Sequence, residues 1–170
     1  MADDMSHSVT VTRTTTTSTT SAILLNTGYF KTYPGLLKLF ELLIGAVIIG
    51  ITAYYSNYAH NYPTSSPEVF LCIVAVTCLV GTGCLLLSCI LSISSASILP
   101  KTIFEVIFHF VATVLYLAAS INFLVEVQRR SRYYGSSNYE AYLAAAILGL
   151  INTVLYFLST ALAYRSYKGK

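Results

Sequence analysis

Four long apolar stretches constrain the fold of this chain more than any other feature of its sequence. They cover residues 36–55, 69–91, 103–125 and 142–164, with lengths of 20, 23, 23 and 23 residues. A helix of about 20 residues crosses the hydrocarbon core of a bilayer, and a backbone in lipid must satisfy its hydrogen bonds internally. A transmembrane β-barrel would instead alternate apolar and polar residues. The sequence therefore predicts an all-α fold, an integral membrane bundle of four transmembrane helices.

The composition agrees with lipid as the main solvent. The chain is 55% hydrophobic and 10% charged, whereas a soluble domain carries about 25% charged residues. Its net charge is only +3, and the basic residues lie at segment ends rather than in the single patch that nucleic acid requires. The composition disfavours a freely soluble enzyme and argues against nucleic acid as a partner.

The chain divides into a polar tail and a membrane domain. We expect residues 1–30 to be a disordered, Thr/Ser-rich cytoplasmic tail with a short interfacial end, residues 31–167 to be the membrane domain, and residues 168–170 to be a cytoplasmic end. With the N-terminus inside, seven basic residues lie on the cytoplasmic side and three outside. Cytoplasmic loops carry the excess of Lys and Arg, so we predict that both termini are cytoplasmic.

Ionisable residues near the ends of two predicted spans form a candidate polar cluster. Lys38 and Glu41 lie three residues apart in the first span, where Lys38 could reach the headgroups and pair with Glu41. Lys101, Glu105 and His109 recur every four residues at the start of the third. At about 1.5 Å per residue, Glu41 and His109 lie about 8 and 9 Å inside their helices. We therefore predict that these helices touch, with Glu41 and His109 hydrogen-bonded or bridged by water.

The cluster has a structural and a functional interpretation. In the first it locks the bundle, and we favour this one. In the second it relays protons or ions, which needs a polar path across the membrane. Asn152 lies near the middle of the fourth span and Asn122 near the outer end of the third. Such amides are better explained as hydrogen bonds between helices, each worth about 0.6–2 kcal/mol.

Small residues spaced four apart predict close helix packing, because lipid supplies no hydrophobic force that would bring helices together. Such ridges serve packing within the bundle or self-association. The predicted packing residues are Ala46 and Gly50 in the first span, Cys84 and Ser88 in the second, and Ala145, Gly149 and Asn152 in the fourth.

Motifs for chemistry are absent from the sequence. It contains no phosphate-binding loop, no HExxH motif and no nucleophile elbow, and we predict no catalytic residue, no metal site and no cofactor. The four cysteines fall within one apolar stretch without a CxxC pair, which favours small packing residues. Cys89, near a membrane boundary, is a weak candidate for fatty acylation.

The run YFKTYPGLLKLFELLIG at residues 29–45, with the spacing of the four spans, resembles the MARVEL-domain family. Within that family the chain is similar to the chemokine-like-factor and MAL/plasmolipin branches. The most specific element is the charged start of the first span, with Gly35, Lys38, Glu41 and Gly45. The resemblance covers about residues 31–167. It implies work where membranes meet, in vesicle trafficking, lipid-domain organisation, junctions or fusion.

The expected function is that of a non-enzymatic multi-pass membrane protein. It would organise membrane domains or escort partners during vesicle trafficking, membrane apposition or cell–cell fusion, including myoblast fusion, in the plasma membrane or in secretory and endocytic vesicles. Short loops suggest that it contacts lipids and other membrane proteins laterally, and further copies of itself. The alternatives are a small channel or transporter, or its auxiliary subunit, and a junction-associated structural protein.

Overall fold

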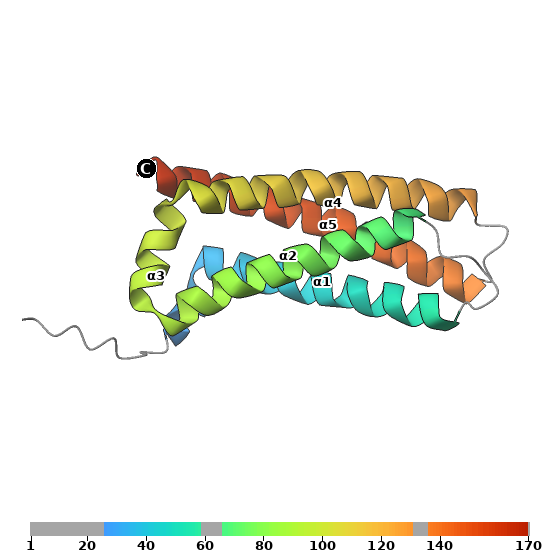
Figure 1. Ribbon diagram of the computed structural model, residues 1–170, viewed down its shortest axis with the longest axis horizontal. Coiled ribbons are helices and arrows are strands. Elements are labelled where there is room, and N and C mark those ends of the chain that lie inside the picture. The colour runs from blue at the N-terminus through green and yellow to red at the C-terminus, as the bar shows by residue number, and fades with distance from the viewer. Residues whose placement is uncertain (1–25, 59–65, 131–135, 170) are drawn as a thin grey trace, which may run out of the picture.

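Four long helices dominate the computed structural model, which describes residues 26–58, 66–130 and 136–169 (Figure 1). Each contains a segment long and apolar enough to cross a membrane, and no strand occurs in the described ranges. The prediction of an all-α bundle with four spans is therefore confirmed. The long helices are α1 (Tyr33–Tyr58), α2 (Ser66–Leu91), α4 (Ile103–Arg129) and α5 (Ser136–Tyr167).

The observed helices run past the predicted spans at most of their ends. The largest difference is in α5, which begins at Ser136 and ends at Tyr167, whereas its predicted span covers residues 142–164. Hydropathy detects the part of a helix that lies in hydrocarbon, but the backbone hydrogen bonds continue into the polar headgroup region. In α1, Pro34 lies in the first turn. A backbone N–H at this position would have no partner within the helix, so its absence in proline costs no hydrogen bond.

Three short elements gather at one end of the bundle, called here the α3 end. They are η1 (Thr27–Lys31), α3 (Ile93–Ile98) and η2 (Leu99–Lys101). The start of α1 and the end of α5 lie at this same end, and α1 finishes at the opposite, far end (Figure 1). Residues 92–102, which connect the second and third predicted spans, are thus mostly helical, and the Ser92 side chain caps α3 by accepting a hydrogen bond from the Ser95 N–H.

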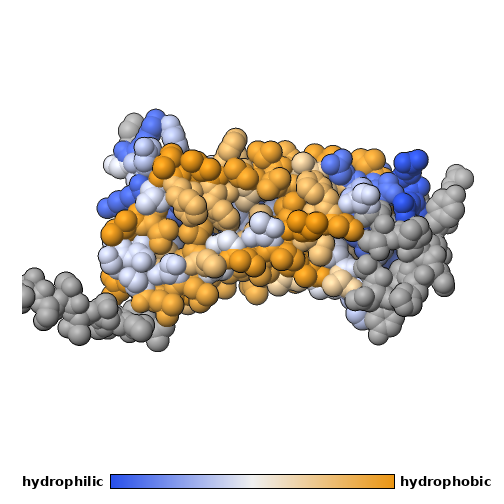
Figure 2. All heavy atoms as spheres, viewed as in Figure 1, coloured by the Kyte–Doolittle hydropathy of each residue, from blue (hydrophilic) through white to orange (hydrophobic). Residues whose placement is uncertain are grey.

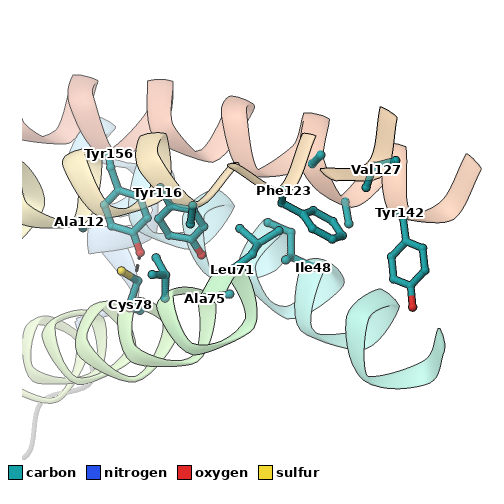
Figure 3. Close-up of a cluster of buried hydrophobic side chains, with 14 residues drawn as sticks. Ile48, Leu71, Ala75, Cys78, Ala112, Tyr116, Phe123, Val127, Tyr142 and Tyr156 are labelled. Atoms are coloured by element: carbon teal, nitrogen blue, oxygen red, sulfur yellow. Dashed lines mark hydrogen bonds between the residues drawn. The ribbon is translucent and has the colours of Figure 1, made fainter. Parts of the chain in front are cut away.

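The helices form a closed bundle in which α1 packs against α2 and α5, and α4 packs against α2 and α5. Their shared interior is a core of aliphatic and aromatic side chains (Figure 3). Tyr116 of α4 stacks on Tyr156 of α5 with ring centroids 5.4 Å apart. Nearer the far end the interior is filled by Ile48, Leu71, Phe123, Val127 and Tyr142.

The outward surface of the bundle is as apolar as its core. On the face drawn in Figure 2, hydrophobic side chains cover the middle of the molecule and hydrophilic ones gather toward its two ends. Large apolar residues on all four long helices are exposed, among them Val47, Val80, Val114 and Val154. Such a surface would aggregate in water, and it is the surface expected for helices that face lipid.

A buried polar cluster between α1, α4 and α5

An ion pair between α1 and α4 forms the first part of the cluster. The Lys38 ammonium donates a hydrogen bond to a Glu105 carboxylate oxygen, and the exposed fractions of these side chains are 2% and 4%. Lys38 also donates to the Tyr29 hydroxyl of η1, at 3.4 Å. A buried charge is tolerated where it is paired and hydrogen-bonded. Lys38 therefore points inward and not toward the headgroups, and the expected pairing with Glu41 is replaced by one with Glu105.

A second part of the cluster connects α1, α4 and α5 beside this ion pair. The Ser159 hydroxyl donates to Oε1 of Glu41. The other carboxylate oxygen, Oε2, lies 3.9 Å from Nε2 of His109, and neither side chain is exposed. That distance is too long for a hydrogen bond. The structure thus brings Glu41 and His109 face to face, without the direct hydrogen bond that was one of the two predicted arrangements.

The other ring nitrogen of His109, Nδ1, has a hydrogen-bond partner that fixes the position of one proton. Nδ1 lies 2.7 Å from the backbone carbonyl oxygen of Glu105. A carbonyl oxygen only accepts, so Nδ1 is the donor and carries hydrogen. Nε2, which faces Glu41, is then an acceptor when the ring is neutral and a donor when it is charged.

The polar cluster continues one turn deeper through α5 and α2. The hydroxyls of Tyr156 and Thr82 lie 2.8 Å apart, and the Asn152 amide donates to the backbone carbonyl of Glu41 at 3.5 Å. Among the described residues, the Tyr116 hydroxyl and Oδ1 of Asn152 have no hydrogen-bond partner. Toward the far end the interior becomes mainly apolar, although Thr52, Glu68 and Ser120 are also buried there.

The short helix η1 closes the cluster at the α3 end. Tyr29, a residue of η1, has a buried side chain. This burial raises the pKa of the Tyr29 phenol above its ordinary value, so the phenol stays neutral. Gly35 allows the close approach, because a Cβ at this position would collide with the backbone carbonyl of Tyr29. Tyr29 therefore lies inside the protein, whereas Tyr33 of the same segment is 83% exposed.

Four of the five residues predicted for the cluster come together in the structure, and one does not. Lys101 is exposed on η2, because η2 ends there and the helical spacing that relates it to Glu105 starts only at α4. Sequence reasoning missed Tyr29 and Ser159. The signal for Ser159 was its position seven residues after Asn152, which places both on one face of a helix.

The predicted packing residues separate into two groups. Ala145, Gly149 and Asn152 are buried, and a Cβ on Gly149 would collide with the Ser120 hydroxyl of α4. The other four do not pack within the described bundle, which leaves the alternative of self-association, because spacing alone does not tell which face of a helix is buried. The residues that point outward are Ala46, Gly50, Cys84 and Ser88.

Fatty acylation of Cys89 stays an untested prediction, and the burial of this residue gives it no support. Its side chain is 1% exposed and packs with Tyr29 and Leu86, so its sulfur is covered by η1. Cys78 is likewise buried, as expected of a packing residue, while Cys84 faces outward. In the described part of the chain, no group of three or more His, Cys, Asp or Glu side chains is arranged to hold a metal ion.

Comparison with known families decides what kind of bundle this is. The membrane-associating domain named MARVEL matches residues 29–162, a range that includes the cluster from Tyr29 to Ser159. The chain belongs to the MARVEL family. The chain is also similar to a curated protein, "Protein singles bar" of Drosophila melanogaster. The two are 28% identical over 152 residues, which make up 85% of each chain. No solved structure matches the chain significantly.

Proposed function

We propose that this MARVEL protein is a non-enzymatic organiser of membranes, which gathers lipids and partner membrane proteins by lateral contacts during vesicle trafficking, membrane apposition or cell–cell fusion, including myoblast fusion. Support comes from where the polar groups lie. Four ionisable side chains of α1 and α4 contact one another inside the bundle, while the outward faces carry apolar residues for lipid and for other helices.

The single observation that carries this proposal is an outward face of small residues on α1. Ala46 and Gly50 are exposed, and a Cβ on Gly50 would meet no atom within 4 Å. Small residues let the backbones of two membrane helices approach closely. Within the described bundle this face is unused, so we infer that it receives a helix of a partner protein or of a second copy.

The orientation follows from the exposed basic residues at the α3 end. Lys31, Lys101, Arg165 and Lys168 are exposed there, and an excess of Lys and Arg marks the cytoplasmic side. We propose that the α3 end is cytoplasmic and that residues 1–30, the last of which belong to η1, lie on that side of the membrane. We further propose that the protein resides in the plasma membrane, in vesicles of the secretory and endocytic system, or in both.

A channel would need a different interior. The polar cluster occupies the α3 end, and the far end is filled by Ile48, Leu71 and Phe123 (Figure 3). A polar path through one copy would therefore have to cross an apolar, closely packed layer. Ion flux into liposomes that contain the purified protein would contradict the proposal.

Proximity labelling in native tissue tests the α1 face directly. The full chain carries a biotin ligase at its C-terminus, and the wild type is compared with Ala46→Leu and with Gly50→Leu. We expect both variants to insert and fold normally but to lose several-fold of the labelling of specific membrane neighbours. The matched control is Ala161→Leu, which makes the same change at an exposed position of α5.

Two outcomes of this labelling would overturn the lateral-contact proposal. One is an unchanged set of neighbours for both α1 variants. The other is an equal loss for Ala161→Leu, which would mean that added bulk anywhere on the surface has the same effect. Neighbours that belong to junctions and not to trafficking or fusion machinery would contradict the proposed setting.

A further inference from the structure

Two ionisable groups, on α1 and on α4, approach each other closely without a hydrogen bond. Oε2 of Glu41 and Nε2 of His109 lie 3.9 Å apart in a fully buried space. Among the described residues, neither of these two atoms has a hydrogen-bond partner. Both atoms belong to titratable groups, so one proton bound at either atom could interact with the other.

The charges around the pair do not balance unless it holds a proton. On α1 and α4 the neighbours are Lys38 and Glu105, which already neutralise each other. An ionised Glu41 beside a neutral His109 would leave one uncompensated negative charge in a low-dielectric interior, which is strongly disfavoured. The neighbours from the other elements are neutral hydroxyl, amide and thiol groups: Ser159, Tyr156 and Asn152 on α5, Cys78 and Thr82 on α2, and Tyr29 on η1.

We propose that Glu41 and His109 form a proton-binding site that holds one shared proton within the membrane domain. The proton lies either on Oε2 of Glu41, as a carboxylic acid that faces Nε2, or on Nε2 of His109, as an imidazolium that faces Oε2. Nδ1 is already committed to the Glu105 carbonyl, so Nε2 is the nitrogen that gains or loses hydrogen. In both forms the pair with its proton is neutral.

A recess at the α3 end gives the proton a route to this site. Its walls include Pro34 and Pro100, and it reaches Lys38, Glu105 and Ser159. Ser159 in turn donates to Glu41. The site therefore exchanges with the solution at the α3 end, on the same side as the exposed basic residues, and not across the apolar far end.

The pH dependence of folding follows from counting protons in each state. An unfolded Glu titrates near about pH 4.3 and an unfolded His near about pH 6.5. Between these values the unfolded chain and the folded pair each hold one proton, so stability from this pair is constant. Above about pH 6.5 the folded pair holds more protons than the unfolded chain, and the folding constant falls by up to about tenfold per pH unit until the site empties.

Equilibrium unfolding of the full chain in mixed detergent micelles, between about pH 5 and pH 9, tests the site. For the wild type we expect constant stability up to about pH 6.5 and a decline above it. Glu41→Gln removes the excess proton of the folded state, so its stability should rise up to about pH 6.5 and then stay constant. His109→Gln leaves a protonated Glu41, so its stability should decline across the whole range.

The matched control is Glu140→Gln, which removes an exposed carboxyl near the far end and should keep the wild-type profile. Differences between profiles cancel the contribution of other titrating groups, including His7 and His60. A Glu41→Gln profile that still declines like the wild type above about pH 6.5 would overturn the proposal. If Glu41→Gln does not fold, the His109→Gln profile decides, and a constant stability below about pH 6.5 would overturn it.

Discussion

The two ends of the bundle interior are built from different chemistry on the same four helices. At the α3 end, α1 and α4 contribute Lys38, Glu41, Glu105 and His109, each with a specific neighbour. At the far end the same two helices contribute Ile48, Ala119 and Phe123, packed in an apolar core. Directional contacts define which helix faces which, whereas apolar contacts in lipid are interchangeable with contacts to lipid tails.

This difference assigns separate structural tasks to the two ends. A Lys38–Glu105 pair forms in one rotation and one register of α1 against α4, and any other arrangement leaves a buried charge unpaired. The far end is tolerant, since cores accept changes of shape when volume is kept. We therefore expect substitutions at the α3 end to have large effects that depend on their partner, and substitutions at the far end to have moderate effects that add.

Lys38→Met should have the largest effect. It leaves the Glu105 carboxylate buried without its cation, and breaking a buried pair in this way destabilises by about 3–5 kcal/mol. Equilibrium unfolding in mixed micelles measures the loss. The double variant Lys38→Met, Glu105→Leu should recover most of it, because an apolar pair of similar volume replaces the ion pair.

Lys101→Met is the matched control for the Lys38 substitution. Lys101 is exposed on η2, and its loss should change the free energy of unfolding by no more than about 0.5 kcal/mol. A Lys38→Met variant as stable as Lys101→Met would show that the α3 end does not depend on its ion pair.

Gly149→Val should have the next largest effect. Its side chain would collide with Ser120 where α5 and α4 meet closely, and overpacking of this kind costs about 1–3 kcal/mol. Gly50→Val makes the same change at a position with no atom within 4 Å, so it should leave stability unchanged or slightly improved. Equal free energies of unfolding for the two variants would mean that the close contact between α4 and α5 at Gly149 does not contribute to stability.

The number and place of the four long helices could be predicted from hydropathy, but their rotation could not. In a soluble bundle the apolar stripe of a helix marks its buried face. Here the lipid-facing side is apolar too, so Ala46 and Gly50 give no sign that they point outward. Where a polar residue breaks the pattern, prediction improves: the depths of Glu41 and His109 followed from the rise per residue.

For a related reason, the sequence could not predict which residues of the cluster pair with each other. Lys38 has Glu41 as its neighbour along the helix, but Glu105 as its neighbour across the interface. Deciding between the two requires the rotation of α1 relative to α4. Ser159 and Tyr29 were missed because one serine in an apolar helix and one tyrosine at a membrane boundary are both ordinary.

Ile48→Val tests the tolerance of the far end. Ile48 is fully buried there, and removing one methylene group should cost about 0.5–1.5 kcal/mol. No titratable group is involved in the change, so the loss should be the same at every pH, unlike that of Glu41→Gln. A loss that varied with pH in the same unfolding experiment would mean that the two ends are coupled.

Thr82→Val should have the smallest effect and locates the boundary between the two ends. It removes the hydroxyl that lies 2.8 Å from the Tyr156 hydroxyl, but Tyr156 keeps the Cys78 carbonyl as an acceptor at 3.5 Å. Hydrogen bonds between membrane helices average about 0.6 kcal/mol, so the loss should be near this value. Thr77→Val, at an exposed position on the same helix, is the control. A Thr82→Val loss above about 2 kcal/mol would place Tyr156 within the directional network of the α3 end, whereas a small loss places it in the apolar core.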